Sequence, residues 1–347
     1  MFSAAHAGAR RGDCMVTVAV IGAGGWGKNH IRNFGEIQSC RLKAVCDLNE
    51  KALAAAKASY KNVETTTSAA AVFGDRQIEA VIIATDAPSH YRLACDALAA
   101  GKHVMVEKPM TLSPADAEDL VKRADAAGRI LMVGHLLEYH PCVLMLKDLV
   151  DKGRLGDLRY MYCQRVNLGV VRKDENAWWS LAPHDVSIVL FVFQAEPVTV
   201  TAQGQAYLQK GVEDVVFAQL KFADGRMAHI HVSWFDPHKI RKVTLVGAER
   251  MATFDDMDAS EKIRIYDKGV TAGAVVGYEQ ALSIRMGDIL IPKTPGGEPL
   301  RLECLHFLEC IEKKKTPRSD GRDGLRVVRV LDAATRSLRA GGAPVNL

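Results

Sequence analysis

Three glycines in the segment VIGAGGWG have the spacing of a loop that binds a dinucleotide. Gly22, Gly24 and Gly27 follow a short apolar run and precede an amphipathic stretch, with Gly25 and Trp26 between them. In such a loop the first glycine makes a tight turn, the second lets a pyrophosphate approach the backbone, and the third lets helix and strand pack closely. This spacing is common in proteins, so the prediction depends on its surroundings.

An aspartate further along the chain supports the prediction of a dinucleotide site. Asp47 lies 20 residues after Gly27, at the end of the next apolar run, where its carboxylate can accept hydrogen bonds from an adenosine ribose. A 2′-phosphate beside Asp47 would bring like charges together, which favours NAD over NADP, although Lys51 and Arg41 weaken that objection. Asp47 could also cap a helix, because Glu50 follows at the spacing of a capping box, and both roles can hold at once.

Lys108 and His184 are residues of the types that the oxidation of an alcohol requires. One group must take the hydroxyl proton while a hydride leaves the carbon. Lys108 follows an apolar run, at the sheet edge where ligands of parallel sheets bind, although most lysines are simply exposed. His184 can accept a proton near neutral pH. The alternative for His184 and Asp185 is that they only begin a helix.

The elements that must position these residues alternate between short β-branched runs and amphipathic stretches. That pattern is typical of βαβ units, which build a parallel sheet covered by helices on both faces. Gly101 and Gly128 follow two of the helices, where left-handed caps favour glycine. Strands are expected at 16–21, 41–46, 79–84, 102–106 and 129–134, and helices at 26–37, 49–60, 88–100 and 114–127.

Longer segments with period-two alternation follow after residue 158. They predict an antiparallel sheet with one face on a core and the other free for a partner. Tyr160, Tyr162 and Trp234 are expected on the free face, and burying that face against another copy predicts a homodimer or homotetramer. Strands are expected at 158–168, 198–208, 215–222, 226–235 and 240–247, with a hairpin turn at 223–226 and helices at 300–313 and 324–338.

The fold class expected is therefore α/β, with two domains. The first is a Rossmann doubly wound parallel sheet over residues 15–140. The second is an α+β domain with a large, open, mostly antiparallel sheet over residues 141–347, whose last helices pack back on the junction. Residues 1–14 are expected to form a leader without regular structure.

Composition excludes several other classes of protein. The 347 residues suffice for two domains, and 48% apolar with 25% charged residues is close to globular averages. A net charge of +4 without long charged runs disfavours nucleic acid as a partner. No apolar run reaches the roughly 18 residues of a membrane span. The eight cysteines form no CxxC pair, which indicates reduced thiols in a cytoplasmic protein. Cys304, His306 and Cys310 lack a fourth ligand for zinc, so no metal is expected.

Several segments together resemble the Gfo/Idh/MocA oxidoreductase family from about residue 16 onward. The resemblance rests on the glycine loop, on Thr85 with Pro88 and His90, on the tripeptide 107–109 (EKP), and on the histidine of NAWWSLAPHDVSIVL. The segments EYHP, RVNLG, WWSLAPHD and SIRMGDILIPKTPGGEPLRLECLHF further resemble its subgroup acting on nucleotide-activated amino sugars, such as UDP-N-acetylglucosamine 3-dehydrogenases. The family also leads us to expect a cis peptide bond between Lys108 and Pro109.

The resemblance implies a site that binds both NAD and a sugar. Lys108 would position the hydroxyl, and His184 would act as the general base. The cofactor would contact Gly22, Gly24, Gly25, Trp26, Gly27, Asp47, Thr85, His90, Glu107 and Lys108. The substrate would contact Glu138, Tyr139, Asn167, Arg172, Asn176, Trp178, Ser180 and His184. Trp178 and Trp179 could equally anchor the core or an interface, and Tyr139 could equally pack at an interface. Basic candidates for a diphosphate are Arg165, Arg172, Lys239, Arg241, Arg285 and Lys293.

Ser180 departs from the family pattern, in which many members have Asp four residues before the histidine. A serine cannot hold negative charge at neutral pH, so a proton relay through a carboxylate would have to be rerouted. The reaction implied is NAD-dependent oxidation of C3 of UDP-N-acetylglucosamine, or of a related UDP-amino sugar, to a 3-keto sugar that could feed an aminotransferase. The alternatives are oxidation of a free polyol or inositol, reduction of a keto sugar, and a non-catalytic NAD-binding regulator.

Overall fold

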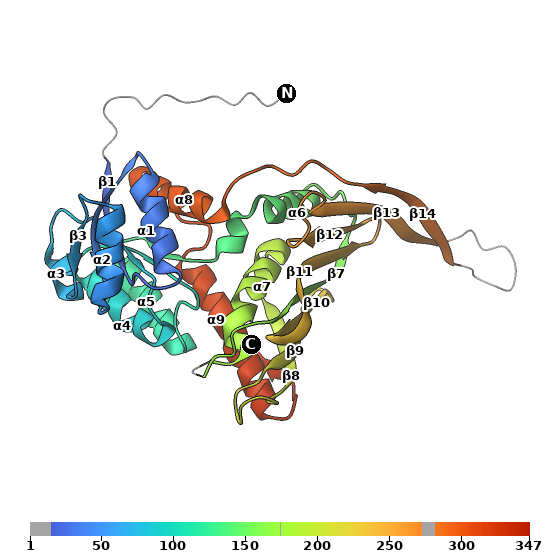
Figure 1. Cartoon of the computed structure of the whole chain (residues 1–347). Helices are drawn as coiled ribbons and strands as arrows, with labels where there is room; N and C mark the ends of the chain where they lie inside the picture. The colour runs from blue at the N-terminus through green and yellow to red at the C-terminus, as the bar shows by residue number, and fades with distance from the viewer. Residues whose placement is uncertain (1–14, 174, 273–281) are drawn as a thin grey trace, which may run out of the picture. The chain divides into compact units, whose positions relative to one another are not determined.

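The computed structural model describes residues 15–173, 175–272 and 282–347, so the predicted leader lies outside the described residues. The chain divides into two compact units (Figure 1). Unit 1 comprises Met1–Glu107, Asp119–Gly134 and Glu303–Asp320, and unit 2 comprises Lys108–Glu118, His135–Leu302 and Gly321–Leu347. The chain therefore passes between the units several times, whereas the sequence analysis expected one boundary near residue 140.

Unit 1 is built on a parallel six-stranded sheet with the order β3-β2-β1-β4-β5-β6. The order reverses at β1, and right-handed crossovers then place the helices of the two halves on opposite faces. The strands are β1 Val16–Ile21, β2 Cys40–Cys46, β3 Glu64–Thr66, β4 Ala80–Ile83, β5 His103–Val106 and β6 Leu131–Val133. The helices are α1 Gly27–Glu36, α2 Glu50–Ser59, α3 Ala69–Gly74, α4 Ala87–Ala99 and α5 Pro114–Ala127.

The predicted strands and helices of this region are all present, with ends shifted by one or two residues. The buried runs of β1 and β4 explain this success, because every residue of both strands is buried. β3 and α3 were not predicted; β3 has three residues, none of them fully buried, and so carries no apolar run. Gly101 and Gly128 adopt φ angles of +74° and +60°, as expected of left-handed caps.

Unit 2 contains a nine-stranded sheet with the order β14-β13-β12-β11-β7-β10-β9-β8-β15. Its neighbouring strands are antiparallel except for β7 and β10, which confirms the prediction of a mostly antiparallel sheet. The strands are β7 Leu158–Leu168, β8 Pro197–Gln205, β9 Val215–Phe222, β10 Met227–Ser233, β11 Phe235–Gly247, β12 Met251–Asp255, β13 Ile263–Ala272, β14 Leu282–Leu290 and β15 Val345–Asn346. The helices are η1 Leu136–Tyr139, α6 Pro141–Asp151, α7 Ala177–Phe193, α8 Pro299–Lys313 and α9 Gly321–Arg339, although α8 belongs to unit 1 from Glu303 onward.

The core of unit 2 lies between one face of this sheet and helices α7 and α9. Buried residues of β7, β9, β10 and β11 join apolar residues of both helices in one cluster. Helix α7 is apolar nearly all round because it is enclosed by the sheet and α9. This arrangement fixes α7, the helix that carries His184, firmly in the unit. No helix among the described residues is long and apolar enough to cross a membrane.

The other face of the nine-stranded sheet is exposed in the described chain. Tyr160 and Tyr162 are 46% and 41% exposed, as expected for alternate residues of β7. The placement of Trp234 on this face was wrong, because Trp234 is buried and its Nε1 donates to Asp214 Oδ1 at 2.9 Å. A residue between two strands does not follow the alternation of either one. Self-association through this face stays a prediction.

Candidate active site

The glycine loop of unit 1 has a shape that only glycine permits at two positions. Gly22 has a φ of +96°, and a Cβ there would lie 2.6 Å from the Ala84 carbonyl oxygen. A Cβ at Gly27 would lie 2.0 Å from the Gly22 carbonyl oxygen. At Gly24 and Gly25 a Cβ would meet no described atom within 4 Å. The outer glycines therefore serve the turn and the helix contact, while the middle of the loop leaves space for a ligand.

Asp47 is bonded directly to this loop. Its Oδ2 accepts a hydrogen bond from Ala23 N at 2.5 Å, and its Oδ1 accepts one from Asn49 N at 2.7 Å. Asn49, rather than Asp47, caps α2, because its side chain accepts from Lys51 N and Ala52 N. The capping alternative for Asp47 is thus wrong. Helix α1 begins without a side-chain cap and without an acidic residue in its first turn, which leaves its first N–H groups and its positive dipole end suited to an anion.

Other predicted cofactor residues of unit 1 are held by hydrogen bonds within that unit. His90 Nε2 lies 3.1 Å from the Thr85 carbonyl oxygen, and Thr85 Oγ1 lies 2.6 Å from Ser89 Oγ. Glu107 is buried, and its Oε1 lies 2.6 Å from His30 Nε2 on α1. This places the Glu107 carboxylate against the helix that follows the glycine loop. Glu107 is therefore held against α1 within unit 1 by its contact with His30.

Lys108 belongs to unit 2 and contacts helix α7. Its Nζ donates a hydrogen bond to the Ser180 carbonyl oxygen at 2.9 Å. The expected cis peptide bond between Lys108 and Pro109 is present. Ser180 lies four residues before His184, which is about one helical turn, so both residues are on the same side of α7. The ammonium group of Lys108 is thereby directed to the part of α7 that carries His184.

His184 has the properties of a neutral base. It is half-buried, and no described residue forms a hydrogen bond with its buried Nδ1. Burial, and after it the positive charges of Lys108 and Arg165, hold the pKa of His184 well below its ordinary value. The imidazole is therefore uncharged at neutral pH and can accept a proton.

A buried polar cluster near η1 was missed by the sequence analysis. His135 Nδ1 lies 2.8 Å from Asp323 Oδ2 and 3.5 Å from Glu138 Oε1, and all three side chains are nearly inaccessible. Only Glu138 was predicted as a site residue. His135 lies three residues before Glu138 in the sequence, but Asp323 is 188 residues away from His135, and no local pattern connects them.

The charges of this cluster follow from its burial together with the interactions among its members. Burial alone would lower the pKa of His135, but its hydrogen bond to Asp323 and the nearby Glu138 carboxylate raise that pKa to about 10. Burial and the charge of Asp323 raise the pKa of Glu138. Against the effect of burial, the hydrogen bond from His135 lowers the pKa of Asp323. The cluster is thus a charged His135–Asp323 pair beside a Glu138 that favours its protonated form.

The same three residues are the donor set that the described chain offers to a metal ion, with ligand atoms within 4.8 Å of one another. A metal bound at His135 Nδ1 would replace the hydrogen bond to Asp323 and require the loss of its proton. We therefore assign the cluster to charge pairing. In the predicted cysteine cluster, His306 Nε2 accepts from Arg318 N at 3.0 Å and contacts Cys310 Sγ at 3.4 Å.

Two residues predicted to contact the substrate instead stabilise the fold of unit 2. Trp178 is fully buried in the core of unit 2, and its Nε1 donates to the Leu331 carbonyl oxygen at 3.1 Å. Trp178 therefore cannot wall a pocket; the alternative of a core anchor is the correct one. Asn176 caps α7 by accepting from Trp179 N at 3.0 Å, and its Nδ2 donates to Glu213 Oε2 at 2.7 Å. Both polar groups of Asn176 are engaged in holding the start of α7.

The remaining predicted substrate residues are spread over unit 2. Tyr139 is buried in η1, and Asn167 is half-buried near the end of β7. Arg172 is exposed and forms an ion pair with Glu175 at 3.0 Å. Ser180 is buried on α7. The structure therefore brings Lys108, Ser180 and His184 together through α7, and leaves Arg172 on an exposed loop.

Family models match most of the described chain. Residues 16–135 match a model described as an oxidoreductase family with an NAD-binding Rossmann fold. Residues 143–253 match the model of the GFO/IDH/MocA C-terminal domain. The two matches cover the glycine loop and Lys108 in the first case and His184 in the second.

Individual proteins resemble the chain over much of its length. A UDP-N-acetylglucosamine 3-dehydrogenase of Acidithiobacillus ferrooxidans is 27% identical over 310 residues, which span 89% of this chain and 93% of that protein. An inositol 2-dehydrogenase of Streptomyces avermitilis is 30% identical over 225 residues, which span 63% of this chain and 66% of that protein. The solved structure of UDP-N-acetylglucosamine 3-dehydrogenase GnnA from A. ferrooxidans has a TM-score of 0.79 at 26% identity, covering 94% of this chain and 98% of that one.

Proposed function

The chain belongs to the Gfo/Idh/MocA oxidoreductase family, and on that premise we propose that it oxidises a secondary hydroxyl of a sugar with NAD. The substrate proposed is UDP-N-acetylglucosamine or a related UDP-amino sugar, oxidised at C3. The observation that carries the proposal is the bond of Lys108 Nζ to the Ser180 carbonyl, one turn before an uncharged His184. The likeness to the UDP-N-acetylglucosamine 3-dehydrogenase of A. ferrooxidans supports the choice of sugar.

Lys108 and His184 act on the substrate hydroxyl group in different ways. An ammonium group carries three N–H donors, so Lys108 can orient a substrate oxygen while it holds Ser180. His184, uncharged because of its burial and its cationic neighbours, accepts the hydroxyl proton. Bound NAD supplies the acceptor for the hydride that leaves the carbon. In unit 1, Gly22, Gly24 and Gly27 with Asp47 would hold the cofactor.

A panel of alcohols tests this function. Purified protein is incubated with NAD and with UDP-amino sugars, free amino sugars and inositols, and NADH formation is measured. We expect the highest kcat/KM with a UDP-N-acetylated amino sugar and a 3-keto product, which an aminotransferase could then consume. A preference for inositol, which the likeness to inositol 2-dehydrogenase makes the second candidate, would contradict the sugar nucleotide. NAD binding without turnover of any alcohol or ketone would favour the non-catalytic regulator.

Replacing Asp47 by asparagine tests the choice of NAD over NADP. The amide keeps an oxygen for the hydrogen bond from Ala23 N but removes the negative charge and the second acceptor, which accepts from Asn49 N. We expect kcat/KM for NADP to rise about tenfold and that for NAD to fall, because the charge no longer repels a 2′-phosphate. Glu50→Gln, which removes an exposed charge from the first turn of α2, is the control. An unchanged ratio of the two cofactors in Asp47→Asn would show that Asp47 does not face the ribose.

A further inference from the structure

Two arginines of unit 2 are direct neighbours across the sheet. Arg165 on β7 pairs with Arg241 on the antiparallel strand β11. Paired residues project from the same face of a sheet, and like charges directly opposite one another are destabilising. Negative charge nearby offsets this cost. The partners of the two arginines therefore show how much of this positive charge is already compensated.

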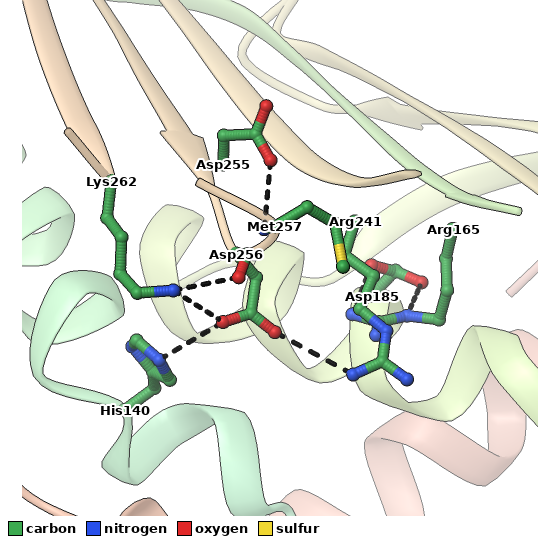
Figure 2. Close-up of polar contacts among 8 residues, drawn as sticks. All are labelled: His140, Arg165, Asp185, Arg241, Asp255, Asp256, Met257 and Lys262. Atoms are coloured by element: carbon green, nitrogen blue, oxygen red, sulfur yellow. Dashed lines mark hydrogen bonds and ion pairs between the residues drawn. The ribbon is translucent and has the colours of Figure 1, made fainter. Parts of the chain in front are cut away.

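Arg165 is fully compensated. Its Nε donates to Asp185 Oδ2 at 2.7 Å and its Nη2 to Asp185 Oδ1 at 3.0 Å, and both side chains are buried. Figure 2 shows the planar guanidinium group beside the carboxylate of α7. A bidentate pair of this kind uses the full negative charge of Asp185. Asp185 follows His184 directly, so this pair also fixes the segment of α7 that carries the proposed base.

Arg241 is compensated only in part. Its guanidinium group forms one ion pair within the described chain, with Asp256 Oδ2 at 3.7 Å, which is too long for a hydrogen bond. Its side chain remains 46% exposed. In Figure 2 the Arg241 guanidinium extends toward Asp256 from the side opposite Lys262. The donors of this group are therefore not engaged by hydrogen bonds of the described chain.

Asp256 is shared among several basic groups. Lys262 Nζ lies 3.4 Å from Asp256 Oδ1 and donates to the Asp256 carbonyl oxygen at 2.7 Å. His140 Nε2 lies 3.6 Å from the same Oδ1. The neighbouring His140, and after it Lys262, hold the pKa of Asp256 below its usual range, so the carboxylate is charged. One negative charge thus faces two fixed cations and an imidazole, which leaves an excess of positive charge on the side of Arg241.

The fold connects this charge to His184, because Arg241 pairs across the sheet with Arg165, whose partner Asp185 directly follows His184 on α7. Arg241 is among the cations that lower the pKa of His184, after burial, Lys108 and Arg165. The other basic candidates from the sequence are compensated or lie on exposed segments. Arg172 pairs with Glu175 at 3.0 Å, and Arg285 pairs with Asp267 at 3.1 Å. Lys239 and Lys293 are exposed and make no ion pair within the described chain.

We propose that Arg241, with Asp256 and Lys262 holding its surroundings, binds an anionic group carried by the alcohol substrate. The group is a phosphate of a nucleotide-linked sugar or the carboxylate of a sugar acid, both of which a guanidinium fork binds in a bidentate way. This inference rests on the proposed function, because it assigns the residue that selects the substrate of the same site. Arg241 is a specificity-determining residue in this assignment, and Lys108 and His184 retain the chemistry.

The test replaces Arg241 by methionine, which keeps the length of the side chain and removes its charge. With UDP-N-acetylglucosamine we expect KM to rise about 10- to 100-fold, the range for loss of hydrogen bonds to a charged group, with a smaller change in kcat. KM for a neutral polyol should be unchanged. Arg241→Lys should recover part of the loss, because it restores charge without the fork. Arg250→Met is the matched control, since Arg250 is also 46% exposed and pairs with one carboxylate, Asp267.

Binding measurements separate this inference from the proposed oxidation. Calorimetry with NAD-saturated protein measures the dissociation constants of UDP, inorganic pyrophosphate and glucuronate, and needs no turnover. Weaker binding of UDP and pyrophosphate in Arg241→Met than in Arg250→Met supports a phosphate site, and a selective loss of glucuronate binding supports a carboxylate site. Wild-type protein that binds none of these anions would overturn the inference, as would equal affinities in the two variants. Thermal unfolding of each variant verifies that it is folded.

Discussion

Lys108→Met is expected to lower kcat by about 10²- to 10⁴-fold, the contribution typical of a group that takes part in proton transfer. Methionine has a similar length but no charge and no N–H donor, so the substrate oxygen loses its orienting group. The bond to the Ser180 carbonyl is lost as well. The measurement is steady-state NADH formation at saturating NAD and sugar, which separates kcat from KM.

Two further variants make the Lys108 result specific. Lys152→Met removes an exposed lysine of the same unit that pairs with Asp148, and it should retain full activity. Lys108→Arg keeps the charge but enlarges the head group, so it should recover little of kcat because an orienting role depends on position. A Lys108→Met enzyme with wild-type kcat would exclude the lysine from the reaction, whatever its effect on KM.

His184→Asn is expected to lower kcat by a similar factor and to change the pH profile. In the wild type, His184 must be uncharged to accept a proton. Because burial and cationic neighbours lower its pKa, the uncharged form persists below the ordinary imidazole range near pH 6.5. We therefore expect kcat/KM to stay level as the pH falls through 6.5 and to decline only at lower pH. His184→Asn should lose this acidic decline together with most of its activity.

Ser180→Asp provides an independent variation of the same pKa. A carboxylate four residues before His184 on α7 would favour the imidazolium form. The pKa of His184 should rise, and the acidic decline of kcat/KM should move to higher pH. His229→Asn, on the exposed face of the sheet, should leave the profile unchanged. An acidic decline that remains in the same place in both His184→Asn and Ser180→Asp would assign it to another group.

The residues that sequence reasoning placed well are those whose signals are local. The glycine spacing, and Asp47 at the end of the next strand, follow from the geometry of one βαβ unit, and Ala23 N donates to Asp47 accordingly. Strands β1 and β4 were predicted because their residues, all of them buried, are apolar except for Thr17. Trp178 shows the limit of this reasoning. Its sequence neighbours suit a pocket wall as well as a core, and only the packing of α7 on α9 buries it.

The sequence by itself determined that this chain has a dinucleotide loop, a parallel sheet whose strands alternate with helices, and an open second sheet. Each of these features depends on patterns within a few tens of residues. It also brought forward Lys108 and His184 as reactive types. Only the tertiary structure decided which charges remain uncompensated. Arg165 forms an ion pair with Asp185 on a helix, and Arg241 and Lys262 both pair with Asp256. His135 forms a hydrogen bond with Asp323, which is 188 residues away. These pairings arise from strand register and helix packing, which bring distant residues together with no local pattern to mark them.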